Sequence, residues 1–431
     1  MSQNSRVDTK FVFFSSILGN ILEYYDFTVY AVFSIQIGKT FFPQNNELVQ
    51  ILLSLAVFAV GFITRPIGGI VFGIIGDRWG RKKSLMISML GMTIPTFVMG
   101  VIPSYETIGL YSTILLIMMR LIQGFCISGE GAGAAIFILE HQQNLKPGVT
   151  AGLVHSANIA GSLLAAFVGI VIEKFFYNEI YAWRFAFVLG SIMGIFGLYF
   201  RIKVTETPIF LMINKKRNKI YQHFSDMIKI SYLAVIITFF TGACASSVVY
   251  LVKSYFNVYY VHILGYEKTI SLYLLFYSSF IMMISMPIAG YVSDQIGRYN
   301  AIRLFVFFLF IIILPAFYVM SLQPYNIILQ VLMLSVEAIA AGLISGGAYI
   351  FVISLFKSHL RFLGVSFSYN FGVAIFGGTS AMISSWLVTI TGLNYAPAFY
   401  VMFTSFILLI LVVFLKRNIK RLILDNRHEI K

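Results

Sequence analysis

Long apolar runs dominate the chain, and short polar stretches separate them. Each run reaches the length of about 20 residues that an α-helix needs to cross the hydrocarbon core of a bilayer. We therefore expect an all-α membrane protein. The runs predict twelve membrane-spanning helices near residues 11–34, 50–72, 83–102, 109–139, 150–172, 183–201, 232–260, 270–292, 301–320, 326–356, 362–388 and 396–415.

One connection is much longer than the others and contains the basic sequence NKKRNK. It falls at the centre of the chain and divides the predicted spans six and six. This division predicts an N-terminal six-helix bundle, a cytoplasmic central loop, a C-terminal six-helix bundle and a basic cytoplasmic tail, at residues 1–201, 202–231, 232–415 and 416–431 respectively.

A charged motif occurs twice, each time after the second predicted span of its half. The first copy reads GIIGDRWGRKK (73–83) and the second reads GYVSDQIGRYN (290–300). Two halves with matching loops indicate a duplicated fold whose halves are related by an axis along the membrane normal. The positions shared by the two copies are Gly73/Gly290, Asp77/Asp294, Gly80/Gly297 and Arg81/Arg298.

The composition supports this class of protein and explains the net charge. The chain is 59% hydrophobic and 11% charged, whereas a soluble domain carries roughly 25% charged residues. Of the 31 Lys and Arg residues, 24 fall on the side that holds both termini and 3 on the opposite side, which makes that side cytoplasmic. The net charge of +14 thus reflects topology and attraction to the lipid bilayer, with no nucleic-acid partner.

The two cysteines, Cys126 and Cys244, lie inside apolar runs and have neither metal-ligand nor disulfide spacing. We expect no metal and no cofactor.

Glu23 and Asp26 lie inside the first predicted span, where a charge costs roughly 2.5–3.5 kcal/mol at the centre of the bilayer. Their spacing of three places both side chains on one face of a helix. Two carboxylates held close together cannot both ionise freely, so one of them could bind and release a proton. The alternative is a structural ion pair that fixes this helix against a neighbour.

Arg120 and Glu130 complete the predicted proton-coupling and substrate-binding group. The Arg120 guanidinium could hold a substrate carboxylate with two hydrogen bonds, or it could neutralise Glu23 or Asp26 permanently. Glu130 stands among small residues that allow close helix approach. We expect it to contact Arg65 or Arg120, in a structural or gating role.

A further set of polar and aromatic residues in the spans could line a transport cavity. Packing is the alternative for each, because a lone histidine or tyrosine on a helix is commonly a structural residue. The set comprises Tyr24, Tyr25, Arg65, His155, Asn158, Glu337, Tyr369 and Asn370.

Several segments resemble one family along most of the chain. They include GNILEYYDFTVY (19–30), FAVGFITRPIGGIVFGIIGDRWGRKK (58–83), RLIQGFCISGEGAGAA (120–135) and RFLGVSFSYNFGVAIFGGT (361–379). The chain resembles the metabolite:proton symporter branch of the major facilitator superfamily, whose members take up proline and betaine, α-ketoglutarate, citrate or shikimate. The resemblance implies a monomeric multi-pass carrier in the bacterial plasma (inner) membrane, coupled to H⁺, with Na⁺ as the alternative ion.

The resemblance also assigns a role to the repeated motif. It implies a cytoplasmic latch in which each aspartate pairs with a helix terminus and an arginine. We expect the first copy to be the stronger latch, because Gln295 stands in the second copy where the first has Arg78. The alternative is that the basic residues only fix the topology. The latch residues would be Gly73, Asp77, Arg78, Gly80, Arg81, Asp294 and Arg298.

The sequence therefore predicts a secondary active transporter, and not an enzyme, that imports a small organic acid or zwitterion with protons by alternating access. An efflux antiporter of the same superfamily is the alternative, although residues 150–170 lack the proline typical of such antiporters. A membrane enzyme or a non-transporting receptor is less favoured, because the sequence shows no nucleophile triad and no phosphate-binding loop.

Overall fold

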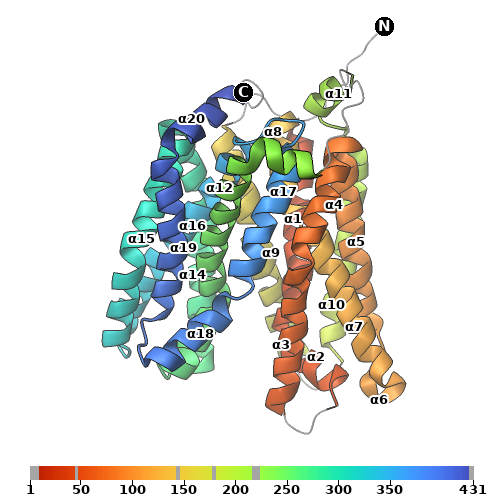
Figure 1. Cartoon of the computed structure of the whole chain (residues 1–431). Helices are drawn as coiled ribbons and strands as arrows, with labels where there is room; N and C mark the ends of the chain where they lie inside the picture. The colour runs from red at the N-terminus through yellow and green to blue at the C-terminus, as the bar shows by residue number, and fades with distance from the viewer. Residues whose placement is uncertain (1–8, 44–46, 142–145, 177–180, 216–223, 427–431) are drawn as a thin grey trace. The chain divides into compact units, whose positions relative to one another are not determined.

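The computed structural model of the chain describes residues 9–43, 47–141, 146–176, 181–215 and 224–426. Helices joined by short connections make up this part of the chain, and no strand occurs in it. The chain forms two compact units (Figure 1). The N-terminal unit comprises Met1–Gln142 and Ala157–Asn218, and the C-terminal unit comprises Gln143–Ser156 and Lys219–Lys431.

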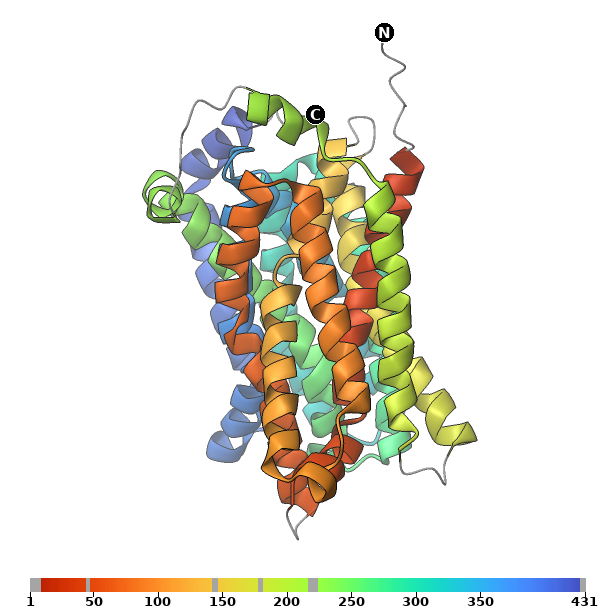
Figure 2. The same ribbon diagram turned by 90° about the vertical axis from the view of Figure 1, so that its right-hand side faces the viewer.

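In the N-terminal unit, α10 packs against α5 and α1, while α7 packs against α3, α4 and α5. Figure 2 turns these helices toward the viewer. The unit contains α1 (Thr9–Val32), α2 (Ser34–Phe41), α3 (Glu47–Ile63), α4 (Arg65–Arg78), α5 (Arg81–Val101), α6 (Tyr105–Ile108), α7 (Leu110–Ile127), α8 (Gly131–His141), most of α9 (Pro147–Phe175), α10 (Trp183–Lys203) and α11 (Pro208–Lys215).

In the C-terminal unit, α16 packs against α12, α14 and α15, and α12 also packs against α17 and α19. The unit contains the first turns of α9, then α12 (Phe224–Tyr250), the π-helical η1 (Leu251–Tyr255), α13 (Phe256–Val258), the π-helical η2 (Tyr259–Ile263), α14 (Lys268–Ile296), α15 (Arg298–Leu322), α16 (Ile327–Ile353), α17 (Arg361–Gly372), the π-helical η3 (Val373–Gly377), α18 (Ser380–Thr391), α19 (Pro397–Phe414) and α20 (Lys416–Asp425).

Eleven of the twelve predicted spans coincide with helices that are long and apolar enough to cross a membrane. The remaining prediction falls on α1, which has the necessary length of 24 residues. It does not reach the same hydropathy because Asn20, Glu23 and Asp26 interrupt its apolar sequence. These polar residues lower the hydropathy of α1, and the same residues make α1 a candidate for function.

Several predicted spans are broken inside the protein. The run 50–72 is divided at Thr64 between α3 and α4. Pro66 stands in the first turn of α4. Proline has no backbone N–H to donate, and in the first turn of a helix that N–H would have no partner within the helix. The fourth run is likewise divided between α7 and α8.

The central loop and the tail also contain helices, α11 and α20, that the apolar pattern does not predict. Parts of both predicted segments, residues 216–223 and 427–431, lie outside the described residues.

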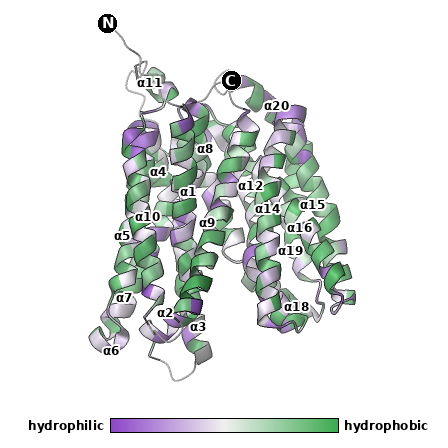
Figure 3. Ribbon diagram, turned by 180° about the vertical axis from the view of Figure 1, so that it is seen from behind, coloured by the Kyte–Doolittle hydropathy of each residue, from purple (hydrophilic) through white to green (hydrophobic). Residues whose placement is uncertain are grey.

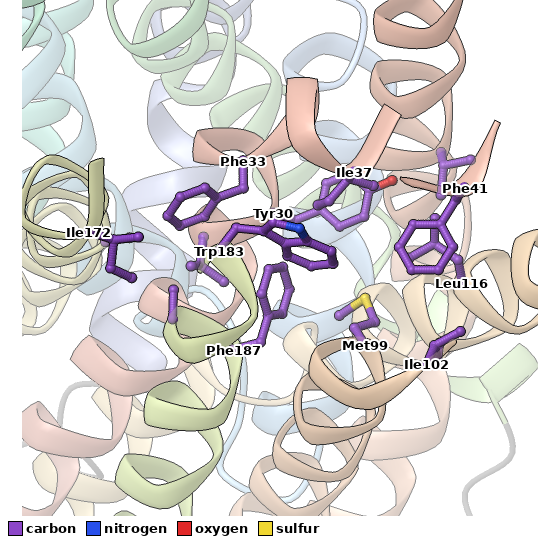
Figure 4. Close-up of a cluster of buried hydrophobic side chains, with 14 of the residues drawn as sticks. Tyr30, Phe33, Ile37, Phe41, Met99, Ile102, Leu116, Ile172, Trp183 and Phe187 are labelled. Carbon is purple, nitrogen blue, oxygen red and sulfur yellow. The ribbon is translucent and has the colours of Figure 1, made fainter. Parts of the chain in front are cut away.

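Buried aromatic side chains hold the N-terminal unit together (Figure 4). Trp183 and Phe187 of α10 pack edge-to-face at a ring distance of 5.5 Å, and Phe41 of α2 meets Trp183 at 6.1 Å. Many large hydrophobic side chains, such as those of Ile195, Phe196 and Phe403, are exposed on the helices. Hydrophobic residues make up much of the ribbon, and hydrophilic residues occur at helix ends such as α20 (Figure 3). This distribution is typical of helices that contact lipid.

We expect Phe187→Ala to destabilise the protein strongly, because it opens a cavity in this cluster. Removing a buried Phe side chain costs about 3–5 kcal/mol. Thermal unfolding of the detergent-purified protein measures the effect. Phe185→Ala is the matched control, since Phe185 lies on the same helix and is 62% exposed whereas Phe187 is 0% exposed. Equal losses in the two variants would contradict this account of the core.

Candidate functional site

The polar residues of α1 face the interior of the N-terminal unit. Glu23 is 4% exposed and Asp26 is 2% exposed. Among the described residues, no hydrogen-bond partner meets either carboxylate oxygen of Glu23 or the Oδ1 atom of Asp26. One turn away, Asn20 donates a hydrogen bond to the side chain of Asn158 on α9. Within the described part of the chain, three of the four oxygens of these candidate coupling carboxyls are thus buried without a hydrogen-bond partner.

A glycine on α10 makes room for Asp26. A Cβ atom at Gly190 would lie 2.5 Å from Asp26 Oδ1 and 2.8 Å from a ring carbon of Tyr25. The Tyr25 hydroxyl donates to the carbonyl of Ala186 over 2.9 Å and fixes the same two helices together. Tyr25 is therefore a packing residue of the α1–α10 contact.

Two arginines lie over one aromatic ring. The Arg120 guanidinium is 4.1 Å from the centre of the Phe27 ring, and the Arg65 guanidinium is 4.8 Å from it. Arg120 also donates to the backbone carbonyl of Phe27 over 3.2 Å. We call Arg65, Phe27 and Arg120 the arginine–phenylalanine group. Cation–π attraction stabilises such an arrangement where hydrocarbon excludes water.

A chain of polar side chains leads from Arg120 to Asp26. Arg120 donates to Gln123 Oε1 over 2.8 Å, and Gln123 Nε2 donates to Thr96 Oγ1 over 2.8 Å. The Thr96 side chain in turn lies beside the Asp26 carboxyl. Sequence reasoning missed Gln123 and Thr96. Gln123 could have been found, since it follows Arg120 by three positions and shares its helix face.

The structure gives Glu130 a partner that the sequence analysis did not predict. Its carboxylate pairs with the guanidinium of Arg201 on α10, with 2.5 Å between Arg201 Nη1 and Glu130 Oε2. Ser88 of α5 donates to the same oxygen over 3.3 Å. The expected contact with Arg65 or Arg120 is wrong, because Glu130 lies in the turn between α7 and α8, where Arg201 of α10 and Ser88 of α5 meet its carboxylate.

Other predicted cavity residues belong to the C-terminal unit. His155 Nδ1 donates to the carbonyl of Ser345 over 2.7 Å, and the His155 ring stacks on Tyr349 at 4.2 Å. Tyr369 meets Tyr349 edge-on at 5.3 Å. Asn370 donates to the Ser366 carbonyl one turn earlier, over 2.8 Å.

Two more of the predicted cavity residues, Tyr24 and Glu337, lie on α1 and α16. Tyr24 lies on α1 against Gly161 of α9, where an added Cβ would come within 3.0 Å of the Tyr24 Cβ. Glu337 is buried within α16.

The first copy of the repeated motif forms a dense charge network. Arg81 contacts Asp77 at 3.2 Å and Glu140 at 3.1 Å. Gly80 immediately precedes α5 and has φ +116°, a conformation that glycine adopts readily. Glu206, which follows α10, accepts hydrogen bonds from the backbone N–H groups of Arg81 and Lys82, each over 3.1 Å. A carboxylate at a helix N-terminus is favourable because of the helix dipole.

The rest of the first copy lies on α4. Gly73 is buried inside α4, and Arg78 is exposed at its last turn.

The second copy contacts a helix terminus directly. Asp294 accepts hydrogen bonds from the backbone N–H groups of Gly148 and Val149, over 2.7 and 3.1 Å, in the first turn of α9. Gly297 has φ +86° and precedes Arg298, the first residue of α15, just as Gly80 precedes α5. The two copies therefore share their glycine geometry, while their aspartates have different neighbours.

The described residues contain no group of three or more His, Cys, Asp or Glu side chains able to hold a metal ion.

Helices long and apolar enough to span a bilayer, with charged side chains kept inside, define a multi-pass membrane protein. The profile of the family described as "Sugar (and other) transporter" matches residues 11–229. The proline/betaine transporter of Escherichia coli (strain K12) is 31% identical over 94% of this chain and 83% of its own length. That of Salmonella typhimurium (strain LT2) is also 31% identical, over the same shares of the two chains.

The fold agrees with these sequence matches. The major facilitator superfamily proton:xylose symporter XylE has a TM-score of 0.78 to this chain at 18% identity, covering 95% of this chain and 96% of its own. The chain belongs to the sugar (and other) transporter family of the major facilitator superfamily, whose members are transporters and not enzymes.

We expect Arg201→Ala to lower the free energy of unfolding by about 3–5 kcal/mol, because it leaves the Glu130 carboxylate buried without its partner. Chemical or thermal unfolding in detergent measures this loss. Arg421→Ala is the control, since the Arg421–Asp425 pair is exposed to solvent. Its removal should change stability by less than about 1 kcal/mol. A stable Arg201→Ala protein would show that the pair does not hold the unit together.

Proposed function

We propose that the protein imports a small organic acid or zwitterion, such as a dicarboxylate, proline or betaine, together with a proton. The observation that carries this proposal is the burial of Glu23 and Asp26 in the same unit as the arginine–phenylalanine group. Three of their four carboxylate oxygens have no hydrogen-bond partner among the residues that the structure describes. The similarity to proline/betaine transporters supports it. Because these relatives are bacterial, the membrane would be the bacterial plasma membrane.

Arg65 supplies donors for a substrate carboxylate. It is 2% exposed, and its Nε and Nη2 atoms have no hydrogen-bond partner among the described residues. A guanidinium presents such donors as a planar fork that fits a carboxylate. The rings of Phe27, Tyr30 and Phe58, which lie near Arg120, could also attract the ammonium end of a zwitterion.

The polar chain between Arg120 and Asp26 supports the proposed proton coupling. A substrate carboxylate that binds near Arg120 adds a negative charge at one end of the Arg120–Gln123–Thr96 chain. A negative charge nearby favours the protonated form of a carboxyl group, so substrate binding would load a proton on Asp26. Release of the substrate would reverse the effect. Glu23, one turn earlier, would hold the second carboxyl of the coupling pair.

Transport would proceed by alternating access of the two six-helix halves, residues 1–201 and 232–415, with both termini in the cytoplasm. Asp77 and Arg81 in the first motif, and Asp294 and Arg298 in the second, would act as the cytoplasmic latch. One copy of the chain contains both halves, so we propose that a monomer is sufficient.

Uptake of labelled proline, betaine and α-ketoglutarate by cells that overproduce the protein tests the function. We expect one of these probes to accumulate and a protonophore to abolish the accumulation. Asp26→Asn should abolish proton-driven accumulation yet retain exchange of labelled for unlabelled probe, because it removes a proton site and keeps the side chain's size. Glu173→Gln, which changes an exposed carboxyl of α9, is the control.

Full accumulation in Asp26→Asn would remove Asp26 from the coupling role. A rise in cell-associated probe on addition of the protonophore would indicate an efflux antiporter instead.

Replacement of Arg65 by lysine tests carboxylate recognition, since lysine keeps the charge and loses the planar fork. A hydrogen bond to a charged group contributes about 1.5–3 kcal/mol, so the KM should rise on the order of tenfold or more. Initial rates over a range of probe concentrations give this value. Arg184→Lys is the matched control, because Arg184 lies in the same unit and bonds to the Gly100 carbonyl. An unchanged KM for Arg65→Lys would contradict the assignment.

A further inference from the structure

A second unpartnered carboxyl lies in the C-terminal unit, apart from the residues used above. Glu337 stands in the middle of α16 and is 0% exposed. Neither of its carboxylate oxygens has a hydrogen-bond partner among the described residues. An isolated ionised carboxylate in an apolar interior is so costly that such groups take up a proton instead.

Two buried tyrosines lie within electrostatic range of this carboxyl. Tyr259 and Tyr260 of η2 are buried, and the charge of Glu337 acts on both phenols. Their rings lie 5.9 Å apart, and the Tyr260 ring lies 5.5 Å from that of Tyr266. The hydroxyls of these three residues and of Tyr255 have no hydrogen-bond partner among the described residues.

The tyrosines lie on an unusual stretch of backbone. The segment Leu251–Ile263 contains two π-helical turns, η1 and η2, separated by the short α13. Each π-turn accommodates an extra residue in the helix and occurs frequently at functional sites. Three of the four unpartnered hydroxyls, those of Tyr255, Tyr259 and Tyr260, thus lie on a locally distorted helix.

The other titratable groups near Glu337 have partners of their own. Tyr277 of α14 bonds to Ser335, two residues before Glu337, over 2.9 Å. Lys253 of η1 lies 6.0 Å from the centre of the Tyr250 ring and acts electrostatically on His155. On the remaining helices that pack against α16, the basic residues stand within two turns of the first residue of their helix; they are Lys229 of α12, Arg298 and Arg303 of α15, and Arg361 of α17.

We propose that Glu337 is a second proton-binding site of the transporter, located in the C-terminal unit and served by the hydroxyls of Tyr259 and Tyr260. The ligand is a proton from water, which converts the carboxylate to a neutral carboxyl. The phenols donate to the carboxylate when the proton leaves and accept from the carboxyl when it returns. This site does not depend on the identity of the transported molecule.

Infrared difference spectroscopy of the full-length protein in detergent, without added substrate, tests the site. The spectrum of wild type minus Glu337→Gln should contain the carbonyl stretch of one protonated carboxyl at neutral pH. The band should shift in D₂O and give way to a carboxylate band as the pH rises. Glu337→Gln should fold, because glutamine has the shape of a neutral carboxyl. Glu267→Gln, which removes an exposed carboxyl of the same unit, is the control and should leave the protonated-carboxyl band unchanged.

Tyr260→Phe provides a second variant and should shift the frequency of the Glu337 band through loss of a hydroxyl partner. Two outcomes would overturn the proposal. A carboxylate band at every pH would show that Glu337 is permanently ionised. A protonated band that neither exchanges in D₂O nor titrates would show a fixed structural acid. The spectra need no transport, so failure of the uptake experiments would leave this test intact.

Discussion

A charge on a membrane-spanning helix must find its partner within the protein, because hydrocarbon offers neither hydrogen bonds nor counter-ions. The N-terminal unit meets this constraint in three ways. Glu130 and Arg201 form a buried ion pair. Arg120 uses the faces of aromatic rings as well as hydrogen bonds. Glu23 is buried with no hydrogen-bond partner for its carboxylate among the described residues. The first two arrangements build structure, and the third leaves a buried carboxyl of the kind that takes up a proton because an isolated charge is costly there.

Close helix contact makes these arrangements feasible. Gly190 brings α10 next to the carboxyl of Asp26, and Gly161 brings α9 next to Tyr24. Small residues let helix backbones approach, and this approach replaces the hydrophobic driving force that is missing within lipid. Larger residues at these positions would separate α1 from the helices that complete the polar cluster. The glycines of the spans therefore contribute to the site although they carry no chemistry.

The sequence predicts the spans well because the thickness of the bilayer imposes a length on every apolar run. It also singles out Asp26 and Arg120 as candidates, because ionisable residues are rare in such runs, and the structure buries both side chains. It does not predict the Glu130–Arg201 pair, because the two residues are 71 positions apart and their contact depends on how the turn before α8 packs against α10. Nor does it predict the break at Thr64 or the π-helical turns, because an apolar run has the same composition whether its helix is regular or interrupted.

The cap on α5 has a consequence for the order of events during biosynthesis. The backbone N–H groups that begin α5 receive their acceptor from Glu206, and 125 positions separate Arg81 from that residue. Chains emerge from the ribosome N-terminal end first. We therefore expect α5, which is the third predicted span, to enter the membrane before the N–H groups of its first turn are capped. Glu206 can accept their hydrogen bonds only after α10 has been synthesised. A chain arrested before Glu206 would leave these N–H groups to bond with water at the surface of the bilayer.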